Sequence, residues 1–480
     1  MNNAFLEKIE RSRVSTTNEI AAEKKKLAEQ YFTPARVSAI MADMFRARPG
    51  QTVSILDPCC GVGNLSAAVL TRAEREQERA VLTLIEKDSF LAELANDNFY
   101  DIVDANVINS DFFDCFPTLS SFDRIVLNPP YSKILAGTEA AKHCVSYLGY
   151  KEANIYSAFV ACCLKLLSND GELVAIIPRS FCNGPLFKRF RNNILEGFYL
   201  KEIYLFESRK IFWDSSVLQE VLILKISRES SEFVRISHEK NNGEISSKEI
   251  CRDKVYFKGD MQKFIHIPLA AGDDELLNKI SKFGNTLLTL GLRASTGKVV
   301  DFRCGDWLLK RKSKNSSFLL YQDSVGVDAN IAFGHGTTGK PRHIKTCKES
   351  MSVLIPRKNY LLVRRISFKE SSTRIVAAPL LEESYVGEYL GVENHLNYIW
   401  GETVTLSSNA CLALFAYLST KTIDSYIRRF SGHTQINATD LNSIPIPELA
   451  ELEFFGERNA TMSMSELIVC AEKIFFCDAW

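Results

Sequence analysis

Continuous apolar runs alternate with helix-forming stretches over the first half of the chain. Continuous apolar runs are typical of buried parallel strands, and they occur here at residues 53–56, 80–85, 105–108, 125–127 and 171–178. Helical patterns lie before, between and after them, at residues 4–30, 37–45, 65–70 and 156–167. This alternation predicts an α/β fold with a parallel, Rossmann-like sheet.

The pattern changes after a last apolar strand at residues 217–226. A polar hinge at 228–231 and an Asn-Gly turn at 242–243 follow, and short strands then alternate with loops until an amphipathic helix at 464–476. We therefore predict an N-terminal helical segment over residues 1–30, a Rossmann-like domain over 31–235, and a mixed α+β domain over 236–480.

Composition narrows the class of protein. The 480 residues are 46% hydrophobic and 24% charged, as in ordinary globular proteins. No apolar run approaches the roughly 20 residues of a membrane helix, and the N-terminus is too polar for a signal peptide. The 13 cysteines lack metal-ligand spacing. We expect a cytoplasmic, reduced protein without a metal site or membrane association.

The formal net charge of zero conceals an uneven distribution. From Arg293 to Arg374 there are 17 Lys and Arg against 6 Asp and Glu, a surplus of 11, so the remaining residues carry 41 against 52. A basic stretch of this kind is typical of a surface that binds a polyphosphate, although a solvated lysine-rich surface would have the same composition.

An Asn-Pro-Pro-Tyr turn ends the strand at 125–127. The prolines make the turn stiff, which fixes the Asn128 amide and the Pro129 carbonyl, while Pro130 leads to the flat ring of Tyr131. Both oxygens can accept hydrogen bonds from one exocyclic amino group as the ring stacks on its base. The turn indicates methyl transfer to an amino nitrogen; the alternative is a strand simply ended by proline.

A glycine-rich turn at 57–64 connects the first strand to the next helix. Gly61 and Gly63 allow close approach of a ligand to the backbone after Asp57 and Pro58. A pyrophosphate is anionic and would be repelled by the Asp57 carboxylate, whereas the cationic methionine end of S-adenosylmethionine would be attracted. The turn therefore favours S-adenosylmethionine over a dinucleotide.

The next two strands also end in candidate ligands. Glu86 closes the second strand and can accept hydrogen bonds from ribose hydroxyls. Asp111 follows the third strand and can accept from the adenine amino group of a cofactor, while Phe112 can pack on its ring. Because parallel strands present their carboxyl ends at one edge of the sheet, we expect these side chains to share one site with Asn128.

In this order the motifs resemble those of γ-type N6-adenine DNA methyltransferases from restriction–modification systems. The residues that carry the resemblance are Thr33-Pro34, Asp57-Pro58-x-x-Gly61-x-Gly63, Glu86, Asp111-Phe112 and Asn128-Pro129-Pro130-Tyr131. The resemblance implies that Thr33, Asp57, Pro58, Gly61, Gly63, Glu86, Asp111 and Phe112 bind S-adenosylmethionine. Thr33 before Pro34 also fits a helix N-cap, which explains both residues structurally.

The resemblance further implies that the target adenine is flipped out of duplex DNA. Asn128, Pro129, Pro130 and Tyr131 would then form the catalytic motif, with Tyr131 stacking on the base. Phe212 is the expected second stacking aromatic; Trp213 is its rival, and a core role is the alternative.

The residues from 236 onward are implied to recognise the DNA target. Candidate DNA contacts within the basic stretch are Lys298, Lys340, Arg342, Arg364 and Arg365. A separately encoded restriction endonuclease is a possible partner on family grounds. Two other functions stay open: methylation of a protein glutamine, and a DNA-binding defence subunit without catalysis.

Overall fold

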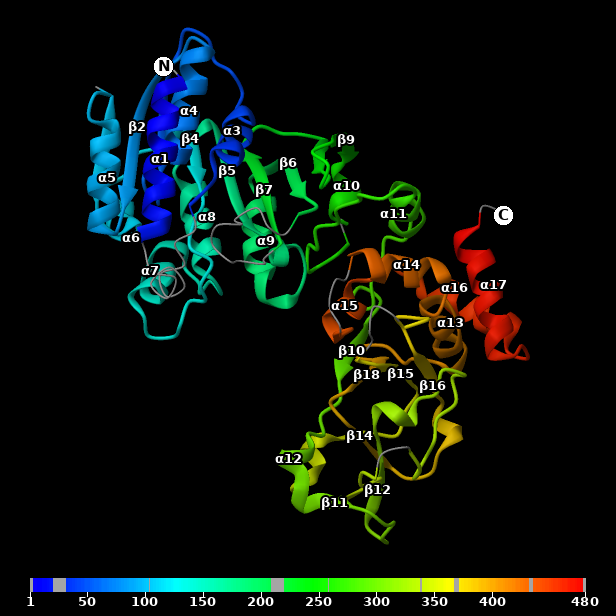
Figure 1. Cartoon of the computed structure of the whole chain (residues 1–480). Coiled ribbons are helices and arrows are strands. Elements are labelled where there is room, and N and C mark those ends of the chain that lie inside the picture. The colour runs from blue at the N-terminus through cyan, green and yellow to red at the C-terminus, as the bar shows by residue number, and fades with distance from the viewer. Residues whose placement is uncertain are drawn as a thin grey trace. The chain divides into compact units, whose positions relative to one another are not determined.

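The computed structural model describes residues 3–19, 32–102, 104–208, 220–257, 259–336, 339–366, 371–430 and 435–477 (Figure 1). The chain forms two compact units, residues 1–255 and 256–480. The boundary expected after residue 235 falls inside strand β8 (Phe233–Glu239), which belongs to the sheet of the first unit.

A nine-stranded sheet organises the first unit, in the order β3-β2-β1-β4-β5-β7-β6-β8-β9. The strands are β1 (Thr52–Asp57), β2 (Arg79–Glu86), β3 (Ala105–Asn109), β4 (Phe122–Leu127), β5 (Leu167–Pro178), β6 (Tyr199–Phe206), β7 (Val221–Ser227), β8 and β9 (Ile245–Cys251). From β3 to β5 neighbouring strands run parallel, whereas β7 is antiparallel to both β5 and β6. The parallel half confirms the predicted Rossmann-like arrangement.

The described helices of the first unit lie before, between and after its strands (Figure 1). They are α1 (Asn3–Glu19), α3 (Ala35–Asp43), α4 (Asn64–Arg75), α5 (Ser89–Phe99), α6 (Phe112–Cys115), α7 (Glu139–Leu148), α8 (Ile155–Lys165), α9 (Lys188–Leu195) and α10 (Arg252–Val255). Helix α8 is apolar and buried on nearly every side, as a helix covering the centre of a sheet must be.

The start of α3 corrects one expectation. Pro34, not Thr33, is the N-cap residue, and no side chain caps this helix end. The fixed φ of proline is compatible with the entry to a helix, so Pro34 can stand at the cap position although it offers no side-chain acceptor. Thr33 is buried, and its hydroxyl takes part in a different hydrogen bond, described below.

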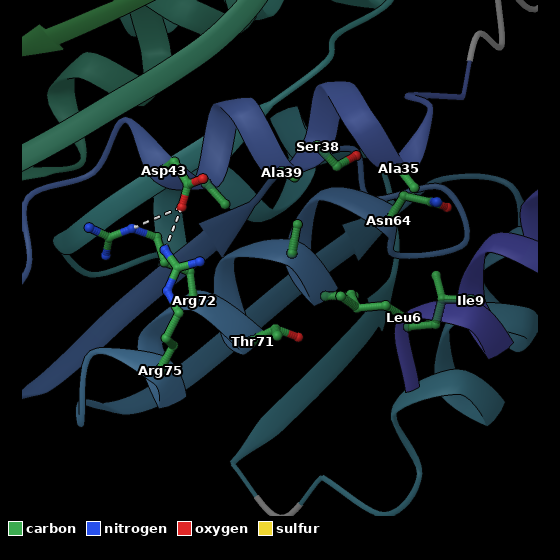
Figure 2. A pocket seen from close by; sticks show the side chains of 13 residues that line it. Leu6, Ile9, Ala35, Ser38, Ala39, Asp43, Asn64, Thr71, Arg72 and Arg75 are labelled. Carbon is green, nitrogen blue, oxygen red and sulfur yellow. Dashed lines mark hydrogen bonds and ion pairs between the residues drawn. The ribbon is translucent and has the colours of Figure 1, made fainter. Parts of the chain in front are cut away.

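A narrow groove of about 120 Å³ lies between α1, α3 and α4 (Figure 2). Small side chains line much of it because alanines on α3 and α4 allow the helices to approach closely. At one end Arg75 donates a hydrogen bond of 2.6 Å to Asp43. Thr71 lies on α4 in the same groove, and its hydroxyl has no hydrogen-bond partner. The groove follows from the packing of the three helices against one another.

Two smaller sheets form the second unit. One has the order β10-β18-β15-β16 and is antiparallel; the other has the order β11-β13-β12-β17-β14. The strands are β10 (Leu292–Thr296), β11 (Leu308–Leu309), β12 (Ser316–Leu320), β13 (His343–Lys345), β14 (Leu354–Pro356), β15 (Tyr360–Arg364), β16 (Ala377–Leu380), β17 (Tyr389–Val392) and β18 (Leu396–Gly401).

The helices of the second unit are α11 (Asp273–Ser281), α12 (Asp301–Cys304), α13 (Ser408–Leu418), α14 (Lys421–Phe430), α15 (Ala438–Ser443), α16 (Leu449–Asn459) and α17 (Met464–Phe476). Helix α13 shares one apolar core with β15, β16 and α17. The predicted mixed α+β class is confirmed. No helix in the described parts of the chain is both long and apolar enough to cross a membrane.

Candidate active site at the carboxyl ends of the strands

A cavity of about 700 Å³ opens in the first unit where β1, β2 and β4 end. Eight of the residues expected from sequence line it: Thr33, Pro58, Gly61, Glu86, Asp111, Phe112, Asn128 and Pro130. These residues come from five separate segments. Four of the segments lie at the carboxyl ends of β1, β2, β3 and β4, which the parallel sheet brings to one edge, and the fifth is the loop before α3. Four expected residues, Asp57, Gly63, Pro129 and Tyr131, lie outside the lining.

The two glycines of the first turn have different tasks. Gly61 has φ +56° and its N–H donates to the Glu86 carboxylate at 2.9 Å, so it forms part of the cavity wall. Gly63 has φ +95° at the N-cap of α4, and a Cβ there would lie 2.4 Å from the Phe99 ring. Gly63 therefore permits close packing of α4 and α5.

Asp57 holds the glycine-rich turn in place through buried hydrogen bonds. Its carboxylate accepts hydrogen bonds from Ser66 Oγ at 2.8 Å and from the Cys59 N–H at 3.4 Å. The side chain is buried, and this burial raises the pKa of Asp57 to about 7. Its contacts make it a brace for the glycine turn.

Glu86 faces the cavity from the end of β2. One carboxylate oxygen accepts from Gly61 N–H, and the other accepts from Asp88 N–H at 2.8 Å. Burial raises the pKa of Glu86 above its ordinary value. Each carboxylate oxygen has a second lone pair, so the fixed carboxylate can still accept from a pair of vicinal hydroxyls.

Asp111 and Phe112 form a further part of the lining. Asp111 caps α6 by accepting from the Phe113 N–H, and its other oxygen lies 2.9 Å from Lys87 Nζ. The Phe112 ring stacks on Phe159 of α8, with centroids 4.9 Å apart. A carboxylate next to an anchored aromatic ring fits recognition of a purine by its amino group and its face.

Asn128 follows β4 directly and is held from both ends of its amide. Its Nδ2 donates to Thr33 Oγ1 at 3.0 Å, and its Oδ1 accepts from the Tyr131 hydroxyl at 2.9 Å. Tyr131 is buried, and its hydroxyl also lies 3.3 Å from the Ile176 carbonyl of β5. The four-residue motif is thus tied to the central strand next to it.

Some participants were not predicted from sequence. Lys87 and Phe159 line the cavity as partners of Asp111 and Phe112, and the Cys59 thiol donates to the Asn128 carbonyl at 3.4 Å. Lys87 could have been noticed because it directly follows Glu86. Nothing in the apolar helix that contains Phe159 distinguishes it from ordinary core. Phe212 lies outside the described residues.

The expected DNA contacts divide into two groups in the second unit. Arg342 is buried and pairs with Asp323 through two hydrogen bonds of 2.7 and 2.6 Å. Arg364 donates to the Val325 carbonyl, and Arg365 to the Asn394 carbonyl. These three arginines hold loops of the fold together. Lys298 and Lys340 are exposed.

Lys340 pairs with Asp301 at 3.1 Å. A more continuous set of exposed basic side chains lies on the loop between β11 and β12: Lys310, Arg311, Lys312 and Lys314. We call these four residues the basic loop.

Comparison with known proteins shows which family the chain resembles. Residues 16–273 match the model of the N-6 DNA methylase family. The chain is 34% identical to Type II methyltransferase M.BsuBI of Bacillus subtilis, covering 92% of both chains. It is 31% identical to Type II methyltransferase M.PstI of Providencia stuartii, covering 88% of both chains.

Among solved structures, the type IIL restriction-modification enzyme MmeI in complex with DNA aligns with a TM-score of 0.45 and 12% identity, over 98% of this chain and 73% of that chain. The family match and the two curated relatives confirm the resemblance inferred from the ordered motifs. The chain belongs to the N-6 DNA methylase family.

Proposed function

We propose that this protein transfers a methyl group from S-adenosylmethionine to the N6 amino group of an adenine flipped out of a specific DNA sequence. It would serve as the modification enzyme of a restriction–modification system. The observation that carries the proposal is the Asn128 amide, fixed at the end of β4 on the wall of the cavity.

The cavity fits the cofactor by the chemistry of its walls. Glu86 offers carboxylate oxygens to the ribose hydroxyls, while Asp111 and Phe112 suit the adenine amino group and ring. Pro58 and Gly61 would contact the remainder of the molecule through the turn. Asp57 and Gly63 would act indirectly, through the shape of that turn. When bound, S-adenosylmethionine supplies an electrophilic methyl group.

The protein's own contribution to the chemistry lies in the catalytic motif. The lone pair of the adenine amino nitrogen is delocalised into the ring, which makes it a poor nucleophile. Hydrogen bonds from its two protons to Asn128 Oδ1 and the Pro129 carbonyl would favour a pyramidal nitrogen, whose lone pair can attack the methyl group. Pro130 keeps the turn stiff, and Tyr131 and Phe212 remain the proposed stacking partners of the flipped base.

DNA contact is proposed for exposed basic residues of the second unit. Lys298 and Lys340 keep this role, whereas Arg342, Arg364 and Arg365 are proposed to shape the loops that approach DNA. The basic loop is added because four exposed cations close together in sequence suit successive phosphates.

The wider setting follows from the substrate. We propose a cytoplasmic location, where bacterial DNA is found; all 13 cysteines are free thiols, as a reducing compartment favours. A separately encoded restriction endonuclease remains the proposed partner. Similarity to the two relatives extends through the second unit, which favours DNA methylation over methylation of a protein glutamine.

The test is direct detection of modified bases. Purified protein is incubated with unmethylated genomic DNA and S-adenosylmethionine, and N6-methyladenine is mapped by sequencing. We expect methyladenine at one short recurring motif. Asn128→Ala should abolish methylation while leaving the dissociation constant of S-adenosylmethionine unchanged. Absence of methyladenine with bound cofactor, or loss of cofactor binding in the variant, would contradict the proposal.

A further inference from the structure

Thr33 lies on the cavity wall next to the amide of Asn128. Its Oγ1 accepts a hydrogen bond of 3.0 Å from Asn128 Nδ2, across 95 positions of sequence. Thr33 is only 4% exposed, so water does not compete strongly for this contact. The residue precedes α3 without capping it, so its hydroxyl is not required by the end of that helix.

We infer that Thr33 is a positioning residue that fixes which end of the Asn128 amide faces the substrate. This role rests on the proposed function, because it concerns the same amide in the same reaction. It differs from the cofactor contact that the sequence motif implied for Thr33.

The chemistry requires such a residue because the two ends of an amide are nearly equal in size but opposite in hydrogen bonding. Only Oδ1 can accept a hydrogen bond from the adenine amino group. If Nδ2 took its place, the two N–H donors of the amide would face the two N–H donors of the adenine amino group. An acceptor at Thr33 Oγ1 stabilises the rotamer with Nδ2 toward Thr33 and Oδ1 toward the opposite side. Tyr131 supports the same rotamer by donating to Oδ1.

The decisive variant is Thr33→Val, which keeps the shape of the side chain and removes the acceptor. We expect the single-turnover rate of methylation, at saturating cofactor and DNA, to fall about 10- to 100-fold. The dissociation constant of S-adenosylmethionine should change less than about twofold. Thr33→Ser restores the hydroxyl and should recover the rate to within about threefold of the wild type.

Thr71→Val is the matched control. Thr71 is a partly buried threonine of the same unit, in the helix groove of Figure 2, and its hydroxyl has no hydrogen-bond partner. This substitution makes the same chemical change away from Asn128. We expect the rate and the melting temperature of Thr71→Val to match those of the wild type.

Three results would overturn the role of Thr33. One is an unchanged rate in Thr33→Val. Another is weaker cofactor binding with a normal rate at saturation, which would make Thr33 a cofactor ligand. The third is a rate loss that Thr33→Ser does not recover. A wild-type enzyme that transfers no methyl group to any unmethylated DNA would instead overturn the proposed function, and the Thr33 role with it.

Discussion

Asp57 combines a buried carboxyl group with a pKa raised to about 7, against an ordinary value of 3.8. Burial is the main cause, because removing the carboxylate from water disfavours its charged form. The hydrogen bonds from Ser66 and Cys59 act in the opposite direction but do not cancel it. Folding therefore favours the protonated carboxyl group, which gives a defined dependence of stability on pH.

The folded pKa lies above the unfolded one, so the folded state binds more protons between about pH 4 and pH 7. The free energy of unfolding should fall as pH rises through this window, by up to about 4 kcal/mol, and level off above pH 7. Urea unfolding of the wild type and of Asp57→Asn over this pH range measures the fall in the free energy of unfolding. The difference between the two curves should shrink toward acid pH; parallel curves would contradict the assignment.

The positions of the candidate residues could be predicted where the fold alone sets them, and less well where the contacts of a side chain decide. Glu86 and Asp111 could be placed on the cavity wall because each lies at the carboxyl end of a parallel strand, and these ends share one edge of the sheet. Arg342 was expected at DNA because charge alone does not reveal a buried partner, and its partner Asp323 lies 19 positions away. The sequence shows that Arg342 is charged, but only the folded structure shows that this charge is paired inside the second unit.

At the scale of elements, Gly63 allows α4 and α5 to pack closely against each other. A side chain there meets the Phe99 ring at 2.4 Å and requires φ +95°, so two separate costs combine. We expect Gly63→Ala to lower the free energy of unfolding by about 2–4 kcal/mol.

Gly149 provides the matched control. It ends α7 with φ +80°, and a Cβ would meet no atom within 4 Å. Gly149→Ala should therefore cost only the backbone term, about 1 kcal/mol. Equal losses of stability in the two variants, measured by urea unfolding, would contradict the packing role of Gly63.

Strands and helices of the first unit were predicted closely because continuous apolar runs leave few alternatives. The run at 53–56 lies within β1, and the helical pattern at 156–167 corresponds to α8. The end of the first unit was harder, because β8 and β9 extend the sheet with half-exposed, polar-alternating strands. Such strands resemble those of the second unit, so periodicity alone could not assign them to the first sheet.

At the scale of the whole molecule, cofactor chemistry and basic charge lie in different units. The cavity belongs entirely to residues 32–159, whereas the basic loop belongs to the second unit. Neutralising the loop should therefore affect DNA binding without changing the cavity.

Replacing all four residues of the basic loop with glutamine tests this separation. Each phosphate contact contributes about 0.9 to the slope of log K against log salt, so the slope should decrease by up to about 3.6. Equilibrium binding to duplex DNA at several salt concentrations measures the slope. The dissociation constant of S-adenosylmethionine should stay unchanged; an unaltered slope would exclude the loop as a phosphate contact.

The hydroxyl of Tyr131 has a consequence for the energetics of base entry. It occupies one of the two lone pairs of Asn128 Oδ1, so an incoming amino group can donate to the other lone pair while the Tyr131 hydrogen bond stays in place. The Ile176 carbonyl, 3.3 Å from the same hydroxyl, is a second acceptor for its proton and also fixes the position of the Tyr131 hydroxyl. We therefore expect that base entry requires no rearrangement of the Asn128 amide, because Tyr131 already holds Oδ1 in place.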